Sequence, residues 1–432
     1  MQKKSLLALL LALMMLLSGC ALVTVDTAKD NARVIVDVNG ETVNKQTVHA
    51  TVDNQLQMNQ YYNQMYSAYG MSASFPTDEA TITTQVIDTY VNQLVGIQKA
   101  KELGLNELTE EEKAEVEATA QESYNSFLDS VASTYLGGST LEGDELRAEA
   151  AKYAEENAIT TADGRNKLED FVASAQDAKA IDKLQAYIIK DVAVTEEEIQ
   201  ADYDAKVESA KADYETNPDN YGYSRMNGAT VYYAPAGYRM VKHILVPISE
   251  EDTAATTEAQ TALTAAQTAL TSAAEDADKD ALQAAVDEAQ AAYDAAQANG
   301  LANAKVKADE IYALATAEGA DFDALISEYS TDSMPAEGYA IREGYAYFVE
   351  PFVTGAMALE NVGDISEPVE STYGYHIIQY VGDVEEGPVD LETVRASIES
   401  SLLSAKQDET TTATMAQYVS EANVKTYADR MN

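Results

Sequence analysis

Two of the three histidines stand in segments typical of β-strands, and they are the side chains with the strongest claim to carry chemistry. His243 lies in the run RMVKHILV (239–246), and His376 lies in YGYHII (373–378). Because β-branched and aromatic residues favour strands, both imidazoles are predicted to lie within a buried sheet. A single buried histidine is usually a satisfied core residue, so neither alone indicates a reactive site. The two histidines together, with the motifs between them, do indicate a candidate reactive site.

The segments between these histidines carry hydrophobic and polar motifs in a defined order. They are Phe322 with Leu325, YSTDS (329–333), FVEPF (348–352), MAL (357–359) and GDISEPV (363–369). With the two strands, this order resembles the parvulin-type peptidyl-prolyl isomerases throughout residues 238–383, apart from a helical insertion at 250–300. The resemblance implies an α+β fold, in which an antiparallel sheet is surrounded by helices.

The resemblance also implies the roles of individual residues. His243 and His376 match the paired central histidines of the family, and Asp332 matches a position that the family fills with Asp or Cys. The proline ring would be received by Phe348, Phe352 and Met357, with Tyr373 and Ser371 beside them. Such a site requires no cofactor and no metal.

The chemistry of prolyl isomerisation suits such residues. Rotation about an X–Pro amide meets a barrier of about 20 kcal/mol because the amide is stabilised by resonance. An apolar pocket that binds the twisted amide more tightly than either planar isomer lowers that barrier. We expect Asp332 to act electrostatically near the rotating carbonyl, while His243 and His376 hold each other and nearby hydroxyls in orientation.

Two stretches depart from the family pattern. Where parvulins usually have Gly-Gly-Glu-Leu-Gly, this chain has EGYAI (337–341), so Ala340 replaces the leucine of the pocket. This departure leaves open a catalytically degenerate domain that serves a chaperone or a binding lipoprotein. The loop ISEED (248–252) stands where phosphate-reading parvulins place Arg or Lys, and its acidic residues would repel a phosphate.

The chain begins with a segment that predicts export. Lys3 and Lys4 precede a twelve-residue apolar run, Leu6–Leu17, which is too short for a membrane-spanning helix of about 20 residues. The run ends at LSGC (17–20), which resembles the lipobox of bacterial lipoproteins and implies a lipid attached to Cys20. The alternative is a simple secreted protein with a chance cysteine. Cys20 is the only cysteine, so the mature chain is predicted to fold without disulfides.

The composition restricts the partners. Lys and Arg number 28 against 73 Asp and Glu, which gives a formal net charge of −45. Such a charge favours solubility, repels nucleic acid and anionic membrane surfaces, and favours neutral or cationic partners.

The pattern of caps, periodicity and turns divides the chain. The predicted parts are a signal peptide (1–20), a tether (21–33), a mostly helical domain (34–216), a linker (217–237), the parvulin-like domain (238–383) and a C-terminal helical segment (384–432). Residues 34–215 contain no Gly-rich phosphate loop and no Ser-centred elbow. In the C-terminal segment we expect a helix over 390–406, a Thr-rich break at 410–414 and a last helix at 415–422.

The insertion has a composition of its own. Seven-residue repeats (AQTALTA, AQTALTS, QAAVDEA and QAAYDAA) predict an Ala-rich helical hairpin that ends in a C-cap at 299–300. Low-complexity disorder is the alternative. The hairpin would serve as a spacer or as a dimerisation arm, and the sequence leaves a homodimer open.

The order of these parts resembles the extracytoplasmic foldases of the PrsA and SurA type. In that family the C-terminal segment folds back onto the N-terminal domain. The resemblance implies a foldase that isomerises X–Pro bonds in unfolded or newly secreted polypeptides, with chaperone activity. It also implies a lipid anchor in the membrane of a Gram-positive bacterium, facing outward, and no nucleic-acid partner.

Overall fold

The computed structural model describes residues 23–24, 28–72, 74–274 and 277–431. The chain divides into two compact units, residues 1–194 with 401–432, and residues 195–400. Cys20 and the predicted signal peptide lie outside the described residues, as do 21–22 and 25–27 of the predicted tether. Of the helices that are described, none has both the length and the apolar composition needed to cross a bilayer.

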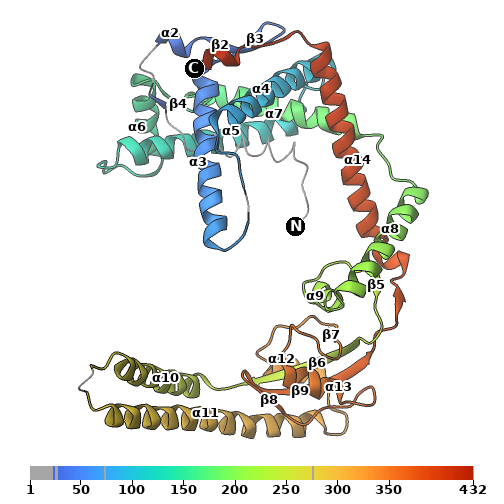
Figure 1. Cartoon of the computed structure of the whole chain (residues 1–432). Helices are drawn as coiled ribbons and strands as arrows, with labels where there is room; N and C mark the ends of the chain where they lie inside the picture. Colours follow the sequence, from blue (N-terminus) through green and yellow to red (C-terminus); the bar gives the residue numbers. More distant parts are fainter. Residues whose placement is uncertain (1–22, 25–27, 73, 275–276, 432) are drawn as a thin grey trace. The chain divides into compact units, whose positions relative to one another are not determined.

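The first unit contains a three-stranded sheet built from both ends of the chain. Strands β2 (Val34–Val38) and β3 (Glu41–Asn44) form the hairpin that the Asn39–Gly40 pair predicts. Strand β11 (Val424–Thr426) pairs antiparallel with β2, so the sheet order is β11-β2-β3 (Figure 1). Helices α3 (Lys45–Ala68) and α4 (Glu79–Glu102) pack on this sheet and bury its apolar side chains. The C-terminal segment thereby completes a sheet that the N-terminal segment begins.

A second helical cluster completes this unit. Helices α5 (Glu110–Tyr135), α6 (Gly143–Glu156) and α7 (Leu168–Ile189) surround a core that contains Phe127 and Phe171. Thr109 and Glu112 form a capping box at the start of α5, as their three-residue spacing in the sequence indicates. The short elements are α2 (Ala28–Asn31), β1 (Val23–Thr24), β4 (Ile159–Thr160), which pairs with β1, and the 3₁₀ turn Ala428–Met431.

Helix α14 (Leu391–Glu421) is continuous, so the predicted break at 410–414 is wrong. Thr411 and Met415 are buried, and the hydroxyl of Thr410 donates to the Lys406 carbonyl at 2.7 Å. Threonine costs a helix only about 0.7 kcal/mol relative to alanine, which the burial of this face outweighs. The threonine run was therefore too weak a signal to end the helix.

The second unit begins before the predicted domain boundary. Helix α8 (Glu196–Thr216), expected in the N-terminal domain, belongs to this unit. Residues 217–237, expected to form a linker, include α9 (Asn220–Met226) and β5 (Tyr233–Ala234), which pairs with β10 (Gly387–Pro388). Tyr221 and Tyr238 are buried with ring centroids 4.8 Å apart. The Tyr-rich composition thus supplies core rings to the second unit.

The centre of the second unit is a four-stranded antiparallel sheet of order β7-β6-β9-β8. These strands are β7 (Tyr339–Ile341), β6 (Arg239–Pro247), β9 (Gly374–Asp383) and β8 (Val369–Ser371). Ile244 and Ile377 on one face pack against α11 (Lys279–Ala315) and α12 (Phe322–Tyr329). Val241 and Ile378 on the other face pack in a core that includes α13 (Glu350–Met357). Sheets flanked by helices confirm the predicted α+β class.

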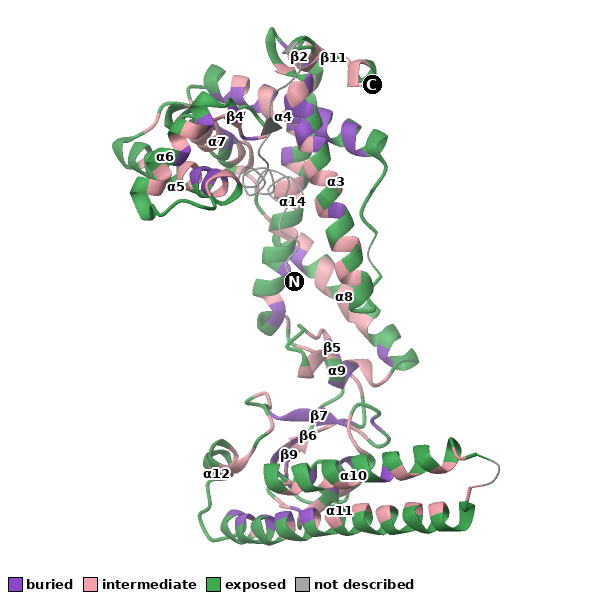
Figure 2. Ribbon diagram, turned by 90° about the vertical axis from the view of Figure 1, so that its left-hand side faces the viewer, coloured by how far each residue is buried: buried purple, intermediate pink, exposed green. Residues whose placement is uncertain are grey.

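The insertion is a helical hairpin, as predicted. In α10 (Glu250–Thr271) and α11 the less exposed positions alternate at three- and four-residue spacing. They are Thr256, Ala259, Leu263, Ala266 and Leu270 in α10, and Leu282, Val286, Ala289, Tyr293, Ala296 and Gly300 in α11. This spacing is that of an antiparallel coiled coil, and Figure 2 shows most of the remaining hairpin surface as exposed.

The predicted helix end at 299–300 is wrong, because α11 continues to Ala315. Gly300 is buried, and a Cβ atom at this position would lie 2.9 Å from Cγ2 of Ile248. The glycine therefore permits close packing at the base of the hairpin and does not cap the helix.

Gly374 provides a test of the turn that leads into β9. Its φ is +123°, and an added Cβ would lie 2.2 Å from the Val246 carbonyl oxygen. We expect Gly374→Ala to destabilise the second unit by about 2–4 kcal/mol, because both the φ angle and the contact are unfavourable. Hydrogen exchange of the β6 and β9 amides, followed by mass spectrometry, measures this change.

Gly382→Ala is the matched control in the same strand, since an added Cβ meets nothing within 4 Å there. Equal exchange rates in the two variants would show that the turn does not require glycine.

Candidate active site

The sheet brings His243 and His376 into direct contact. His243 of β6 is paired with Ile378 of β9, and Leu245 is paired with His376. Because alternate residues of a strand share a face, both imidazoles lie diagonally on one face of the sheet. Their Nδ1 atoms are 3.2 Å apart, and both side chains are buried. Two residues 133 positions apart thus form one hydrogen-bonded pair.

Asp332 holds the outer nitrogen of His243. It lies in the loop after α12, and its Oδ2 atom is 2.8 Å from Nε2 of His243. The hydroxyl of Tyr339 in β7 donates to the same carboxylate oxygen at 3.1 Å and approaches the Ser333 carbonyl at 3.2 Å. The Asp332 side chain remains about one-third exposed, so one side of this carboxylate faces solvent.

Ser371 holds the outer nitrogen of His376. Its Oγ lies 2.8 Å from Nε2 of His376 and accepts the Tyr373 N–H at 3.1 Å. Ser371 itself is buried, whereas Tyr373 is exposed. The structure therefore places Ser371 within the buried chain of hydrogen bonds, and Tyr373 at its solvent side.

One proton arrangement satisfies this chain with both rings neutral. His243 donates from Nε2 to the Asp332 carboxylate, and His376 donates from Nδ1 to Nδ1 of His243. Nε2 of His376 then accepts the hydroxyl proton of Ser371. These tautomers follow from the hydrogen-bond partners, since each donor must face an acceptor.

Aromatic rings cover one side of the histidine pair. The ring of Phe352, in α13, lies edge-on to both imidazoles, with centroids 5.0 Å from His243 and 5.2 Å from His376. Phe348 stacks on Phe352 at 5.1 Å and is only partly buried. Phe352 is fully buried, so Phe348 and the partly buried Met357 offer the apolar surface that a ligand can reach.

The site favours an ionised carboxylate at Asp332 and a neutral imidazole at His376. The hydrogen bond from His243 is the main cause that lowers the pKa of Asp332 below its usual range, so this carboxylate is ionised at neutral pH. Burial, reinforced by the neighbouring His243, lowers the pKa of His376 to about 4. Burial and the adjacent Asp332 raise the pKa of Tyr339, so its hydroxyl remains a donor.

Tyr339 and Arg239 were missed by the sequence analysis. Arg239, at the start of β6, donates from Nη1 to the carbonyls of Ala356, Met357 and Leu359 at 2.9–3.3 Å. It thereby satisfies the free carbonyls at the end of α13 and fixes the backbone of Met357. In the sequence, Arg239 only follows the Tyr-rich segment 217–237, and this position does not predict a contact with the end of α13. Tyr339 lies in the stretch EGYAI, whose departure from the family pattern carries no signal for its hydrogen bond to Asp332.

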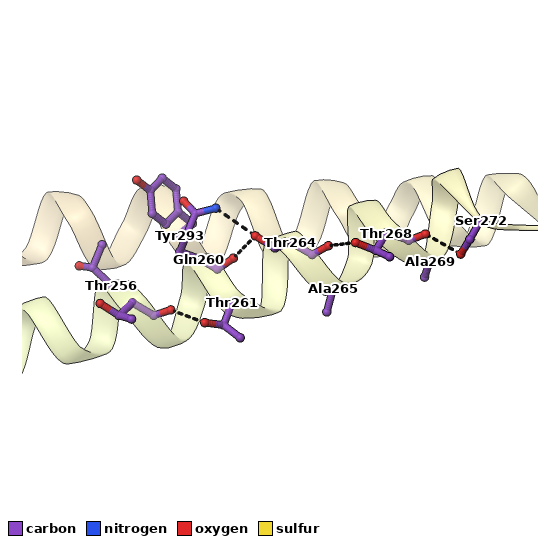
Figure 3. Close-up of a pocket in the computed structure, with 10 residues that line it drawn as sticks. Thr256, Gln260, Thr261, Thr264, Ala265, Thr268, Ala269, Ser272 and Tyr293 are labelled. Carbon is purple, nitrogen blue, oxygen red and sulfur yellow. Dashed lines mark hydrogen bonds between the residues drawn. The ribbon is translucent and has the colours of Figure 1, made fainter. Parts of the chain in front are cut away.

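No group of three or more His, Cys, Asp and Glu side chains among the described residues is arranged to hold a metal ion. A groove of about 890 Å³ lies on the hairpin, lined only by residues of α10, its end and α11 (Figure 3). The hydroxyls of Thr261, Thr264 and Thr268 donate to carbonyls of their own helix. The groove is open and shares no residue with the histidine chain, so its size alone does not make it a reactive site.

Comparison with known proteins gives two family matches. Residues 290–382 match the PPIC-type PPIASE domain, and residues 1–130 match the SurA-like N-terminal domain. The chain thus contains a parvulin-type domain and a SurA-like domain, which confirms both resemblances. The first match includes Asp332 and His376 and begins after most of the insertion. His243 lies outside it and joins the site through the pairing of β6 with β9.

Curated relatives are similar over a quarter of the chain. The Foldase protein PrsA 2 of Listeria innocua is 37% identical over 110 residues, which is 25% of this chain and 38% of that protein. The Foldase protein PrsA of Oceanobacillus iheyensis is 40% identical over 101 residues, 22% of this chain and 32% of that protein. The crystal structure of PrsA from Bacillus subtilis covers 90% of this chain and 91% of its own, with 18% identity and a TM-score of 0.19. This chain therefore spans less than two-fifths of the curated relatives named here.

The pKa of His376 yields a prediction about pH and stability. In the unfolded chain this histidine titrates near 6.5, but in the folded protein near 4, so the folded state binds fewer protons between these values. The contribution of neutral His376 to the free energy of unfolding is therefore fully present above about pH 6.5 and is lost as the pH is lowered toward 4. The loss is about 3 kcal/mol, because a shift of one pKa unit corresponds to about 1.4 kcal/mol.

An NMR titration of the His376 ring measures the pKa directly, with His376→Asn identifying its resonance among the three histidines. A midpoint near 6.5 in the folded protein would contradict the prediction.

Proposed function

We propose that this chain is an extracytoplasmic foldase that catalyses cis/trans isomerisation of X–Pro bonds in secreted proteins. Cys20 would anchor it by a lipid to the outer face of a Gram-positive cell membrane, and its helical unit would provide chaperone activity. The observation that carries the isomerase proposal is the hydrogen-bonded chain Asp332–His243–His376–Ser371, whose two imidazoles are buried against Phe352. The PPIC-type match over 290–382 supports the same activity.

The site offers what rotation about an amide requires. No bond is broken, so no nucleophile is needed; the site must bind the twisted amide better than the planar forms. In our proposal the proline ring lies against Phe348 and Met357, the two partly buried apolar side chains. Removing water from the amide favours the twisted form, because the planar amide is more polar and loses more hydration.

Asp332 supplies a fixed negative charge beside this apolar surface. The planar amide carries partial negative charge on its carbonyl oxygen, so a carboxylate near that oxygen disfavours the planar form. The hydrogen bonds from His243 and Tyr339 hold the carboxylate in one position and keep it ionised. His243, His376 and Tyr339 are thus positioning residues that act through Asp332.

A second function, a chaperone with an inactive parvulin-type domain, is favoured by one observation. Phe348 stands where the family commonly has Met or Leu, and the rings of Tyr339, Tyr345 and Phe352 lie within 4.8–5.7 Å of it. Four packed rings fill more space than aliphatic side chains would. If they leave no room for a proline ring, the domain serves as a scaffold.

Exchange NMR on a short proline peptide distinguishes the two functions. We expect the full-length protein without its signal peptide to accelerate cis/trans exchange. Asp332→Ala should lower kcat/KM by about tenfold or more, because a positioned charge in a partly dry site contributes at least about 1.4 kcal/mol. Tyr339→Phe should cause a smaller loss, since it removes one hydrogen bond to the carboxylate and leaves the bond from His243 in place.

Asp323→Asn is the matched control, because the Asp323 side chain is largely exposed and pairs with Lys242 in the same unit, away from the histidine chain. Wild-type protein that leaves the exchange rate unchanged would favour the chaperone alone. Equal activity in the Asp332 and Asp323 variants would refute the role of Asp332.

A further inference from the structure

The far half of α3 carries aromatic and methionine side chains that remain exposed among the described residues. The buried side chains of this helix extend no further than Asn59. Beyond it, 62% of Tyr61, 74% of Tyr69 and 50% of Met71 are exposed. We call the following cluster the aromatic tip: Tyr61, Tyr62, Tyr66, Tyr69, Met71 and Phe75. In Figure 1 this end of α3 extends beyond α4, which packs on the first half.

Hydrogen bonds hold the aromatic tip in a defined arrangement. Asn63 donates to the Phe75 carbonyl at 3.0 Å and accepts the Phe75 N–H at 2.9 Å. Asn59 donates to the Pro76 carbonyl at 2.7 Å. These amides hold residues 75–76 against the helix, and the ring of Phe75 lies 5.7 Å from Tyr62 and 6.0 Å from Tyr66. The fold thus uses polar side chains to order rings that remain accessible to solvent.

The aromatic tip is also electrically neutral. Residues 54–77 contain no Asp, Glu, Lys or Arg, and no other run in the chain is as long without one. The whole chain carries 73 acidic against 28 basic residues. An apolar, uncharged surface therefore lies on a strongly acidic molecule. An exposed apolar cluster of this kind marks an interaction site more often than a solvated face.

We propose that the aromatic tip binds apolar segments of unfolded polypeptides whose flanking residues are neutral or basic. Tyrosine and methionine give large contact areas with adaptable shape, which suits many different sequences. The net negative charge of the molecule attracts basic flanks and repels acidic ones. The same charge opposes a second copy of the chain, because two molecules of net charge −45 repel each other. This inference rests on the chaperone part of the proposed function and is independent of the isomerase.

Binding of a proline-free peptide tests the proposal. The probe is a short fluorescent peptide of Leu, Phe and Ser flanked by lysines, and its binding to the full-length protein without the signal peptide is followed by anisotropy. The test variant combines Tyr61→Ser, Tyr69→Ser and Met71→Ser, none of which is a buried side chain. We expect its affinity to fall about tenfold or more, equivalent to about 1.4 kcal/mol. A glutamate-flanked peptide should bind more weakly than the lysine-flanked one, and added salt should reduce that difference.

The matched control combines Tyr187→Ser, Val306→Ser and Leu314→Ser, three exposed apolar side chains in other helices. Equal peptide affinity in the test and control variants would overturn the proposal. A wild-type dimer that the test variant dissociates, seen by sedimentation, would also overturn it, because the tip would then be a self-association surface. The proline-peptide exchange rate of the test variant should equal that of the wild type, so failure here is distinct from failure of the isomerase proposal.

Discussion

A single proton shared between two buried nitrogens is the constraint on which the site depends. The Nδ1 atoms of His243 and His376 are 3.2 Å apart, so one of them must carry a hydrogen and the other must not. The tautomer of one imidazole then fixes the tautomer of the other. Asp332 and Ser371 anchor the two outer nitrogens, and one arrangement with both rings neutral satisfies the three hydrogen bonds that join these four side chains. A slip of one residue between β6 and β9 would turn an imidazole to the opposite face and destroy the chain.

The rest of the second unit preserves this strand pairing. Arg239 joins the beginning of β6 to the end of α13, and so links the histidine strand to the helix that carries Phe352. The long insertion follows the end of β6 without disturbing it. Its two helices meet at their base, where Asn303 donates to Asp252 at 3.1 Å and Gly300 packs near Ile248. Because the two ends of the hairpin lie side by side, its insertion adds little more loop-closure entropy to the parent fold than a short loop would.

The parts predicted well from the sequence were those with a strong local or family signal. The Asn39–Gly40 turn, the capping box of Thr109 and Glu112 and the seven-residue repeats each fix local geometry in a way that tertiary packing rarely overrides. The fold class and the order of motifs between His243 and His376 came from the resemblance to parvulins. The individual site roles remain predictions. Their convergence depends on strand register, which no local pattern determines.

The parts predicted poorly had local signals that packing outweighed. Tyr, Asn, Gly and Pro between 217 and 237 suggested a linker, but Tyr221 is buried in the core. The threonines of 410–412 and Gly300 lower helix propensity by amounts of about 1 kcal/mol, less than burial of the adjacent face contributes. Tyr339 had no signal of its own, because its hydrogen bond to Asp332 joins two segments that only the folded chain brings together.

The net charge of −45 opposes self-association through the exposed aromatic rings. Apolar clusters on a neutral protein promote association, whereas strong charge of one sign keeps copies apart. Here the acidic residues are excluded from 54–77, and the rings of the aromatic tip lie within that uncharged run. Repulsion acts over about 8 Å at physiological ionic strength, which is enough to oppose the approach of another acidic surface. It does not oppose a flexible neutral or basic segment, because such a chain can reach the rings without bringing a second acidic body near. The excess of acidic residues is therefore part of the recognition chemistry as well as a source of solubility.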